Sequence, residues 1–255
     1  MASKEDIGSA FYPMVIFFGI TSVYFLLKAK FNSSKSGLIL SIIYIFSILI
    51  TMFFINLLLT KSICGSMQYD TAALITFLPW ILLFGLLKIM LSIFPGWLSP
   101  FSNTLGYLVA RLNGVTDIFN KILSPKMANL DAPESLKIAT EALEHIYNDK
   151  SLLINEITQS NFDRFWEQMS NAGMLKRGVT EFKEQLRQLV RAKDLVAEYV
   201  WYLLTGLLVT SVSYNIAIDA ECKRTVQDIK NIDNERLKEA KNLAKKTDQI
   251  YKSYE

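Results

Sequence analysis

Three long apolar runs occupy the first part of the chain and predict membrane-spanning helices. The clearest run is 37–60, which contains no charged residue and is rich in Leu, Ile, Phe and Met. A helix rises about 1.5 Å per residue, so about 20 apolar residues cross the hydrocarbon layer of a bilayer. Similar runs cover 7–27 and either 71–87 or 71–94. We therefore expect a three-helix transmembrane region over 1–95.

Prolines and aromatic residues interrupt the apolar pattern after the third run, where the sequence reads FPGWLSPFSNT. Pro95 and Pro100 disfavour a continuous helix because proline lacks an amide hydrogen. The rings of Phe94, Trp97 and Phe101 are of the kind that gathers at the membrane–water interface. These five residues predict an elbow at the membrane surface.

The segment after the elbow repeats apolar residues at helical spacing. Polar residues such as Arg111 and Asp117 fall largely on the other side of this pattern over 105–123. An amphipathic helix of this kind lies along a membrane or covers a neighbouring helix. We expect 96–123 to be an elbow followed by one interfacial helix. A helix in a water-soluble core is the alternative.

Residues 124–196 are more polar and predict several amphipathic helices. Pro133 and nearby acidic residues favour a helix start near Asp131, and further helices are expected to begin near Ser151, Asn161 and Thr180. A module of about 70 residues is small for an independent core, so we expect it to pack against the membrane region or a partner protein.

A second uncharged stretch, 199–218, predicts either a fourth membrane span or a buried or peripheral helix within a segment over 197–218. Gly206, Thr210 and Ser213 are spaced so that they share one helix face. Small residues on one face allow close helix contact in membranes. We expect these three residues to be a helix-packing site.

The last segment, 219–255, has many charges of both signs and an incomplete series of apolar positions. Val226, Ile229 and Leu237 belong to that series. The pattern is typical of a helix that binds a partner or forms a short coiled coil, and equally of a solvated terminal helix. Self-association through these three residues is one expectation.

Basic residues predict the orientation in the membrane. Lys28, Lys30 and Lys35 lie between the first two runs, whereas only Lys61 lies between the second and third. Short loops rich in Lys and Arg stay cytosolic, so the first loop is expected on that side. If 199–218 crosses the bilayer, Cys64 and Cys222 lie on the same non-cytosolic side and can pair.

Composition and motifs argue against catalysis and against nucleic-acid binding. Residues 1–123 carry 8 basic and 4 acidic side chains, and residues 124–255 carry 19 and 20. Neither half is basic enough to neutralise many phosphates. The sequence lacks the common nucleotide-binding, zinc-protease and hydrolase motifs, and His145 is its single histidine. We expect no enzyme activity, cofactor, catalytic residue or metal site.

Two strings, FPGWLSPFSN and WYLLTGLLVTSVSYN, resemble the multi-span minor capsid proteins of large icosahedral DNA viruses, such as the chlorella-virus group. The resemblance implies an all-α structural protein of the virion, embedded in the inner membrane beneath the capsid. It also implies contacts with the lipid bilayer and with major and other minor capsid proteins, after assembly on a host endomembrane. The alternative function is a small-solute transporter or channel.

Overall fold

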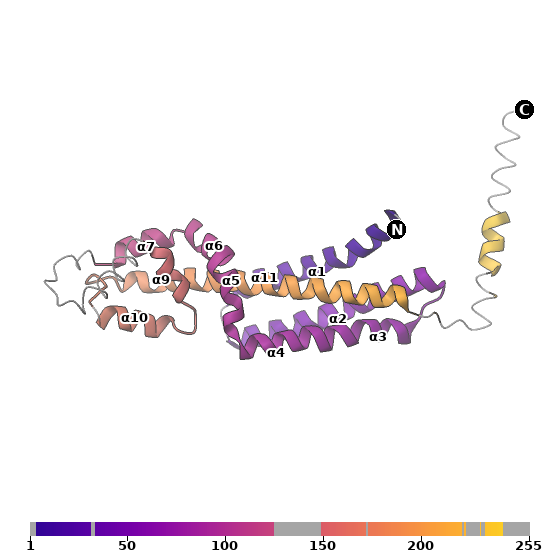
Figure 1. Ribbon diagram of the computed structural model, residues 1–255, viewed down its shortest axis with the longest axis horizontal. Helices are drawn as coiled ribbons and strands as arrows, with labels where there is room; N and C mark the ends of the chain where they lie inside the picture. The colour runs from indigo at the N-terminus through magenta and orange to yellow at the C-terminus, as the bar shows by residue number, and fades with distance from the viewer. Residues whose placement is uncertain are drawn as a thin grey trace, which may run out of the picture. The chain divides into compact units, whose positions relative to one another are not determined.

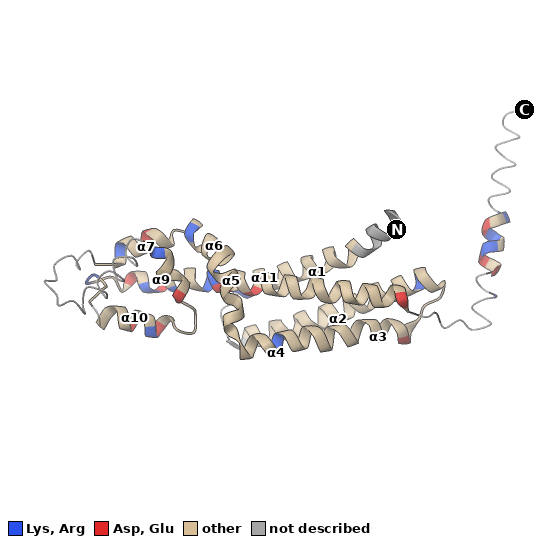
Figure 2. Cartoon of the chain, viewed as in Figure 1, with Lys and Arg blue, Asp and Glu red and all other residues tan. Residues whose placement is uncertain are grey.

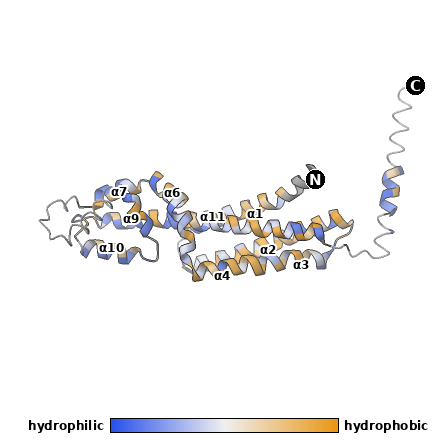
Figure 3. Cartoon of the chain, in the orientation of Figure 1, coloured by the Kyte–Doolittle hydropathy of each residue, from blue (hydrophilic) through white to orange (hydrophobic). Residues whose placement is uncertain are grey.

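The computed structural model describes residues 4–31, 34–124, 149–171, 173–220, 222, 230 and 233–241, without the side chains of 4–10 and 34–35. Within these ranges the regular secondary structure is helical, and one isolated antiparallel bridge joins Leu123 to Leu175. Four helical stretches are long and apolar enough to cross a membrane: Phe11–Lys30, Ser36–Cys64, Tyr69–Ile93 and Glu181–Asp219. The prediction of an all-α multi-span protein is confirmed. Figure 3 shows hydrophobic residues along α1 to α4.

The membrane-type helices are α1 (Lys4–Lys30), α2 (Ser34–Cys64), α3 (Tyr69–Pro79), η1 (Trp80–Phe84), α4 (Gly85–Ile93) and α11 (Glu181–Asp219). The shorter elements are η2 (Pro95–Leu98), α5 (Ser99–Phe101), η3 (Ser102–Gly106), α6 (Tyr107–Leu112), α7 (Val115–Ile122), α9 (Lys150–Glu156) and α10 (Phe162–Asn171). They are labelled in Figure 1 where space allows.

The chain divides into two compact units. Unit 1 comprises Met1–Ile20, Ser41–Leu86 and Gly206–Glu255, and unit 2 comprises Thr21–Leu40 and Leu87–Thr205. The long helices α1, α2 and α11 contribute residues to both units. Each unit is described below by itself.

Unit 1 packs apolar helices around a few uncharged polar contacts. The fully buried ring of Phe17 lies 5.6 Å from that of Trp80, centroid to centroid. On α2, the amide of Asn56 donates a 2.8 Å hydrogen bond to Thr76 Oγ1 on α3. Most large side chains on the outer faces of α1, α2 and α3 are exposed and apolar, as expected for surfaces covered by lipid.

A π-helical segment interrupts the third apolar stretch immediately after Pro79. Proline cannot donate the hydrogen bond that continues an α-helix, and a wider turn is a common accommodation. This segment orients Trp80 and Phe84 into the interior, where both are buried. The helix then resumes as α4.

Unit 2 contains a helical core outside the apolar runs. Its members include buried residues of α7, α9, α10 and α11, among them Phe119, Ile154, Phe162 and Leu186. The charged residues of α7, α9, α10 and the first part of α11 stand out in Figure 2. This is the arrangement of a water-exposed helical module with an apolar centre.

The segment 105–123, for which one helix was predicted, is divided into two helices, α6 and α7. Gly114 has a φ of +87° and separates α6 from α7. Glycine adopts this left-handed conformation without the strain of a side chain, so the chain turns there. The apolar face divides in consequence. Val115 and Phe119 are buried in the core, whereas Leu108 and Leu112 are exposed.

Some predicted features lie outside the described residues. These include the helix expected near Asp131, His145, and both Val226 and Ile229. In the last segment, 233–241 is helical and the side chain of Leu237 is 57% exposed. Self-association through the terminal segment therefore stays a prediction.

Candidate interface between apolar helices and the polar module

The predicted elbow is a chain of short helical turns within unit 2. Helix α4 ends at Ile93, Phe94 adopts a φ of −119° and a ψ of 69°, and Pro95 occupies the start of η2. Pro100 similarly lies in the first turn of α5. Proline is suited to a first helical turn because its missing N–H would have no intrahelical partner there. Both prolines thus begin new turns.

The aromatic residues of the elbow form a continuous cluster with Trp201 of α11. Phe94 and Trp97 stack at 5.7 Å between ring centroids, and Trp97 lies 5.9 Å from Trp201. The ring of Phe101 packs edge-to-face against Trp201, with 6.3 Å between the ring centroids. Phe94 and Trp97 remain 47% and 42% exposed. The elbow therefore packs against α11, while the rings of Phe94 and Trp97 stay partly exposed.

An ion pair joins the end of α1 to α11. Lys28 Nζ lies 2.6 Å from both carboxylate oxygens of Glu198. About two turns before Glu198 on α11, Arg191 Nη2 donates a 3.0 Å hydrogen bond to the backbone carbonyl of Lys28. The side chains of Lys28 and Glu198 are 28% and 24% exposed, so water screens this pair only partly.

Asp194 ties two further segments to α11. One of its oxygens accepts a 3.3 Å hydrogen bond from Ser102 Oγ in η3, and the other accepts a 2.8 Å bond from the backbone N–H of Gln159. Next to it, the fully buried Lys193 places its Nζ 3.7 Å from the Asp194 carboxylate. A single carboxylate thus connects the elbow and the α9–α10 loop to the same helix.

Gly106 allows η3 to approach α11 closely. A Cβ at this position would lie 2.5 Å from the backbone carbonyl oxygen of Lys193. Only glycine leaves room for the two backbones at this distance.

On the outer face of the module, Asp163 receives hydrogen bonds from Arg187 at 2.5 and 3.1 Å. These bonds, together with the neighbouring Lys183, lower the pKa of the Asp163 carboxyl to about 2. The same contact raises the pKa of Arg187. This exposed pair fastens α10 to α11.

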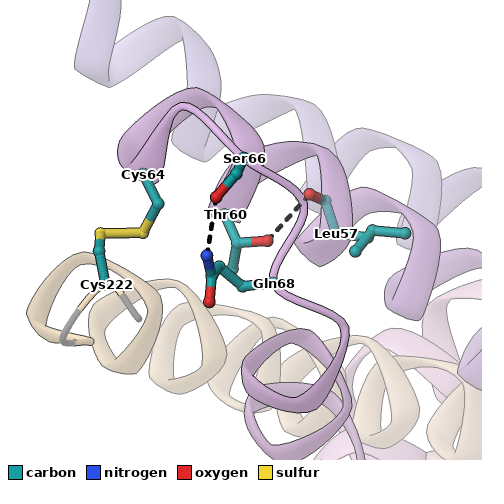
Figure 4. The surroundings of a disulfide bond; sticks show 6 residues. All are labelled: Leu57, Thr60, Cys64, Ser66, Gln68 and Cys222. Atoms are coloured by element: carbon teal, nitrogen blue, oxygen red, sulfur yellow. Dashed lines mark hydrogen bonds between the residues drawn. A yellow bond between two sulfur atoms is a disulfide. The ribbon is translucent and has the colours of Figure 1, made fainter. Parts of the chain in front are cut away.

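A disulfide lies at one end of unit 1. Figure 4 shows Cys64, the last residue of α2, bonded to Cys222 beyond the end of α11. Cys64 is 3% exposed. The sequence left this pairing open, and the structure joins the two residues across 158 positions. In a membrane protein the bond requires both residues on one face, which agrees with a crossing by 199–218.

The small residues predicted as a helix-packing site lie in unit 1. The ring of Phe17 occupies the space beside Gly206, because a Cβ there would lie 1.9 Å from Phe17 Cζ. Thr210 and Ser213 are each 3% exposed. Thr210 Oγ1 donates a 2.7 Å hydrogen bond to the Gly206 carbonyl, which satisfies the hydroxyl within α11.

Sequence reasoning missed the charged contacts at Lys28, Arg191, Asp194 and Glu198. Part of the signal was present, since Lys28 and Glu198 lie at the borders of apolar runs, but the pairing of residues 170 positions apart requires the fold. The described residues contain no group of three or more His, Cys, Asp or Glu side chains able to hold a metal ion.

Comparison with protein-family models, curated proteins and solved structures finds no match to this chain.

Proposed function

We propose that this protein is a membrane-embedded minor capsid component of a large icosahedral DNA virus, which links the capsid shell to the inner membrane. The observation that carries the proposal is α11. One uninterrupted helix of 39 residues begins in the polar module and continues through the uncharged stretch 199–218. A module joined in this way to a membrane helix would be anchored at the bilayer by α11 itself.

The contacts around α11 support a mechanical role. The Lys28–Glu198 pair, the aromatic contacts of Trp201 and the Asp194 hydrogen bonds hold three other segments of unit 2 against this helix. The resemblance of the FPGWLSPFSN and WYLLTGLLVTSVSYN strings to viral minor capsid proteins adds the virion context. Each copy makes modest contacts, and a repeating shell multiplies them through effective concentration.

Stepwise extraction of purified virions tests this function. Mild detergent removes the lipid of the inner membrane, and the remaining shells are separated by sedimentation. A tether is expected to remain partly with the shells, at a level above that of a viral membrane protein with no shell contact. Complete release with the lipid fraction at every detergent concentration would refute the tether.

A second candidate function is transport of a small solute. It is favoured by a cation within the third apolar stretch, where Lys88 Nζ lies 6.0 Å from the ring centroid of Tyr202 on α11. Ionisable residues within membrane segments often mark solute pathways. Reconstituted liposomes should then show a flux that is lost in K88A. Equal flux in wild type, K88A and protein-free liposomes would eliminate this candidate.

A further inference from the structure

Unit 2 contains a cavity of about 430 Å³ where its apolar segments end. It lies among the end of α1, the elbow, the α9–α10 loop and α11. Its volume is within the range of small-molecule sites. Four charged side chains line it: Lys28, Arg191, Asp194 and Glu198. The lining thus holds two positive and two negative groups.

Three of these charged groups are already occupied by protein partners, whereas Arg191 has hydrogen-bond donors left over. Lys28 and Glu198 neutralise each other, and both oxygens of Asp194 accept hydrogen bonds. Arg191 uses Nη2 for the carbonyl of Lys28. A guanidinium has five N–H donors in a planar fork that suits phosphate, so Arg191 can bind a phosphate with the others.

An acceptor without a donor lies in the same wall. The side-chain oxygen of Asn155 is buried and has no hydrogen-bond partner in the structure. A buried carbonyl oxygen without a donor costs free energy. An ammonium group has N–H donors that satisfy such an oxygen. A quaternary choline nitrogen carries no N–H and cannot donate.

The position of the cavity indicates where its ligand comes from. Lys28 lies in the last turn of α1, next to the end of an apolar stretch, and Pro95 follows the end of another. Ends of spans lie at the depth of lipid headgroups. We propose that this cavity binds the phosphoethanolamine headgroup of a membrane phospholipid, with Arg191 on the phosphate and Asn155 on the ammonium.

This site rests on membrane residence and not on the capsid assignment, so either proposal can fail alone. A bound headgroup would also contact α1, the elbow and α11 at once. Lipid would then strengthen the same contacts that brace the polar module.

Native mass spectrometry of the purified full-length protein tests the site. Delipidated protein is incubated with equal amounts of phosphatidylethanolamine, phosphatidylcholine and phosphatidylglycerol of identical acyl chains. We expect phosphatidylethanolamine to be retained most. Loss of a charged hydrogen bond typically costs on the order of tenfold in affinity, so R191Q should retain about tenfold less of it. N155A should retain the lipid but lose most of the preference over phosphatidylcholine, because the choline headgroup differs at the amine.

Matched variants and a soluble probe make the result decisive. R164Q changes an exposed arginine of α10 outside the cavity and should bind as wild type. Equal retention of the three lipids by wild type, or unchanged retention by R191Q, would overturn the site. Soluble phosphoethanolamine is added separately. If it binds as tightly as the lipid, the ligand is a free metabolite and the lipid assignment is wrong.

Discussion

The two units are held together by different kinds of interaction. In unit 1 the interior polar contacts are uncharged, as in the Asn56–Thr76 hydrogen bond, and a disulfide closes one end. In unit 2 charged side chains such as Lys28, Glu198 and Asp194 connect the segments. The cost of removing charge from water explains the difference. Apolar surroundings favour close packing of uncharged side chains, whereas charges can pair where water remains within reach.

The largest effect is expected from the disulfide of unit 1. C222S should lower the free energy of unfolding by about 2–4 kcal/mol, because the bond restricts the unfolded chain. Thermal unfolding in detergent measures the change. C64S and the double variant should match C222S, since each removes the same bond. An unchanged unfolding temperature after reduction of the wild type would contradict this role.

Close packing in unit 1 is tested at Gly206. G206A places a methyl group against the buried ring of Phe17 and should cost about 1–3 kcal/mol, as overpacking does. Gly85 is the matched control, because nothing lies within 4 Å of a Cβ there. G85A should be neutral or should stabilise by up to about 1 kcal/mol, since alanine favours the helix. Equal stabilities of G206A and G85A would show that the Phe17 contact is absent.

The charged contacts of unit 2 are tested at Lys28. K28A leaves Glu198 partly buried without its partner and should cost about 1–2 kcal/mol, between the values for exposed and buried pairs. K30A, at an exposed position two residues on, should change stability by less than about 0.5 kcal/mol. A double-mutant cycle with E198Q isolates the pair. A coupling energy of zero would show that the Lys28–Glu198 pair does not stabilise the fold.

The smallest effect is a pH dependence confined to unit 2. The pKa of Asp163 is lowered to about 2 in the folded protein from an ordinary value of 3.8. Its contribution to stability is therefore fully present above about pH 4 and is lost as the pH falls through about 2. Hydrogen exchange of α10 should rise over that interval. D163N should abolish the change, and an identical pH response in D163N would assign it to other groups.

The sequence predicted the elements whose cause is local. The uncharged run 37–60 predicts a span because of its length and composition, and Pro95 and Pro100 predict the interruption after the third span. The turn at Gly114 was missed because an isolated glycine within an amphipathic pattern does not by itself reveal its φ.

The candidate interface depended on contacts between distant segments. Composition places Lys28 and Glu198 at the borders of apolar runs, but their pairing is set by how α1 packs against α11. The Cys64–Cys222 bond could not be predicted from the sequence for the same reason, since it requires the fourth apolar stretch to bring Cys222 back beside α2.

Chemical crosslinking of intact virions, read by mass spectrometry, tests the tether most directly. Lys121, Lys150 and Lys176 lie in the polar module of unit 2 and supply reactive amines. Crosslinks from these lysines to shell proteins are expected, and they should persist after the lipid is extracted. An absence of any crosslink to a shell protein, in virions where this protein crosslinks readily to other membrane proteins, would contradict the tether.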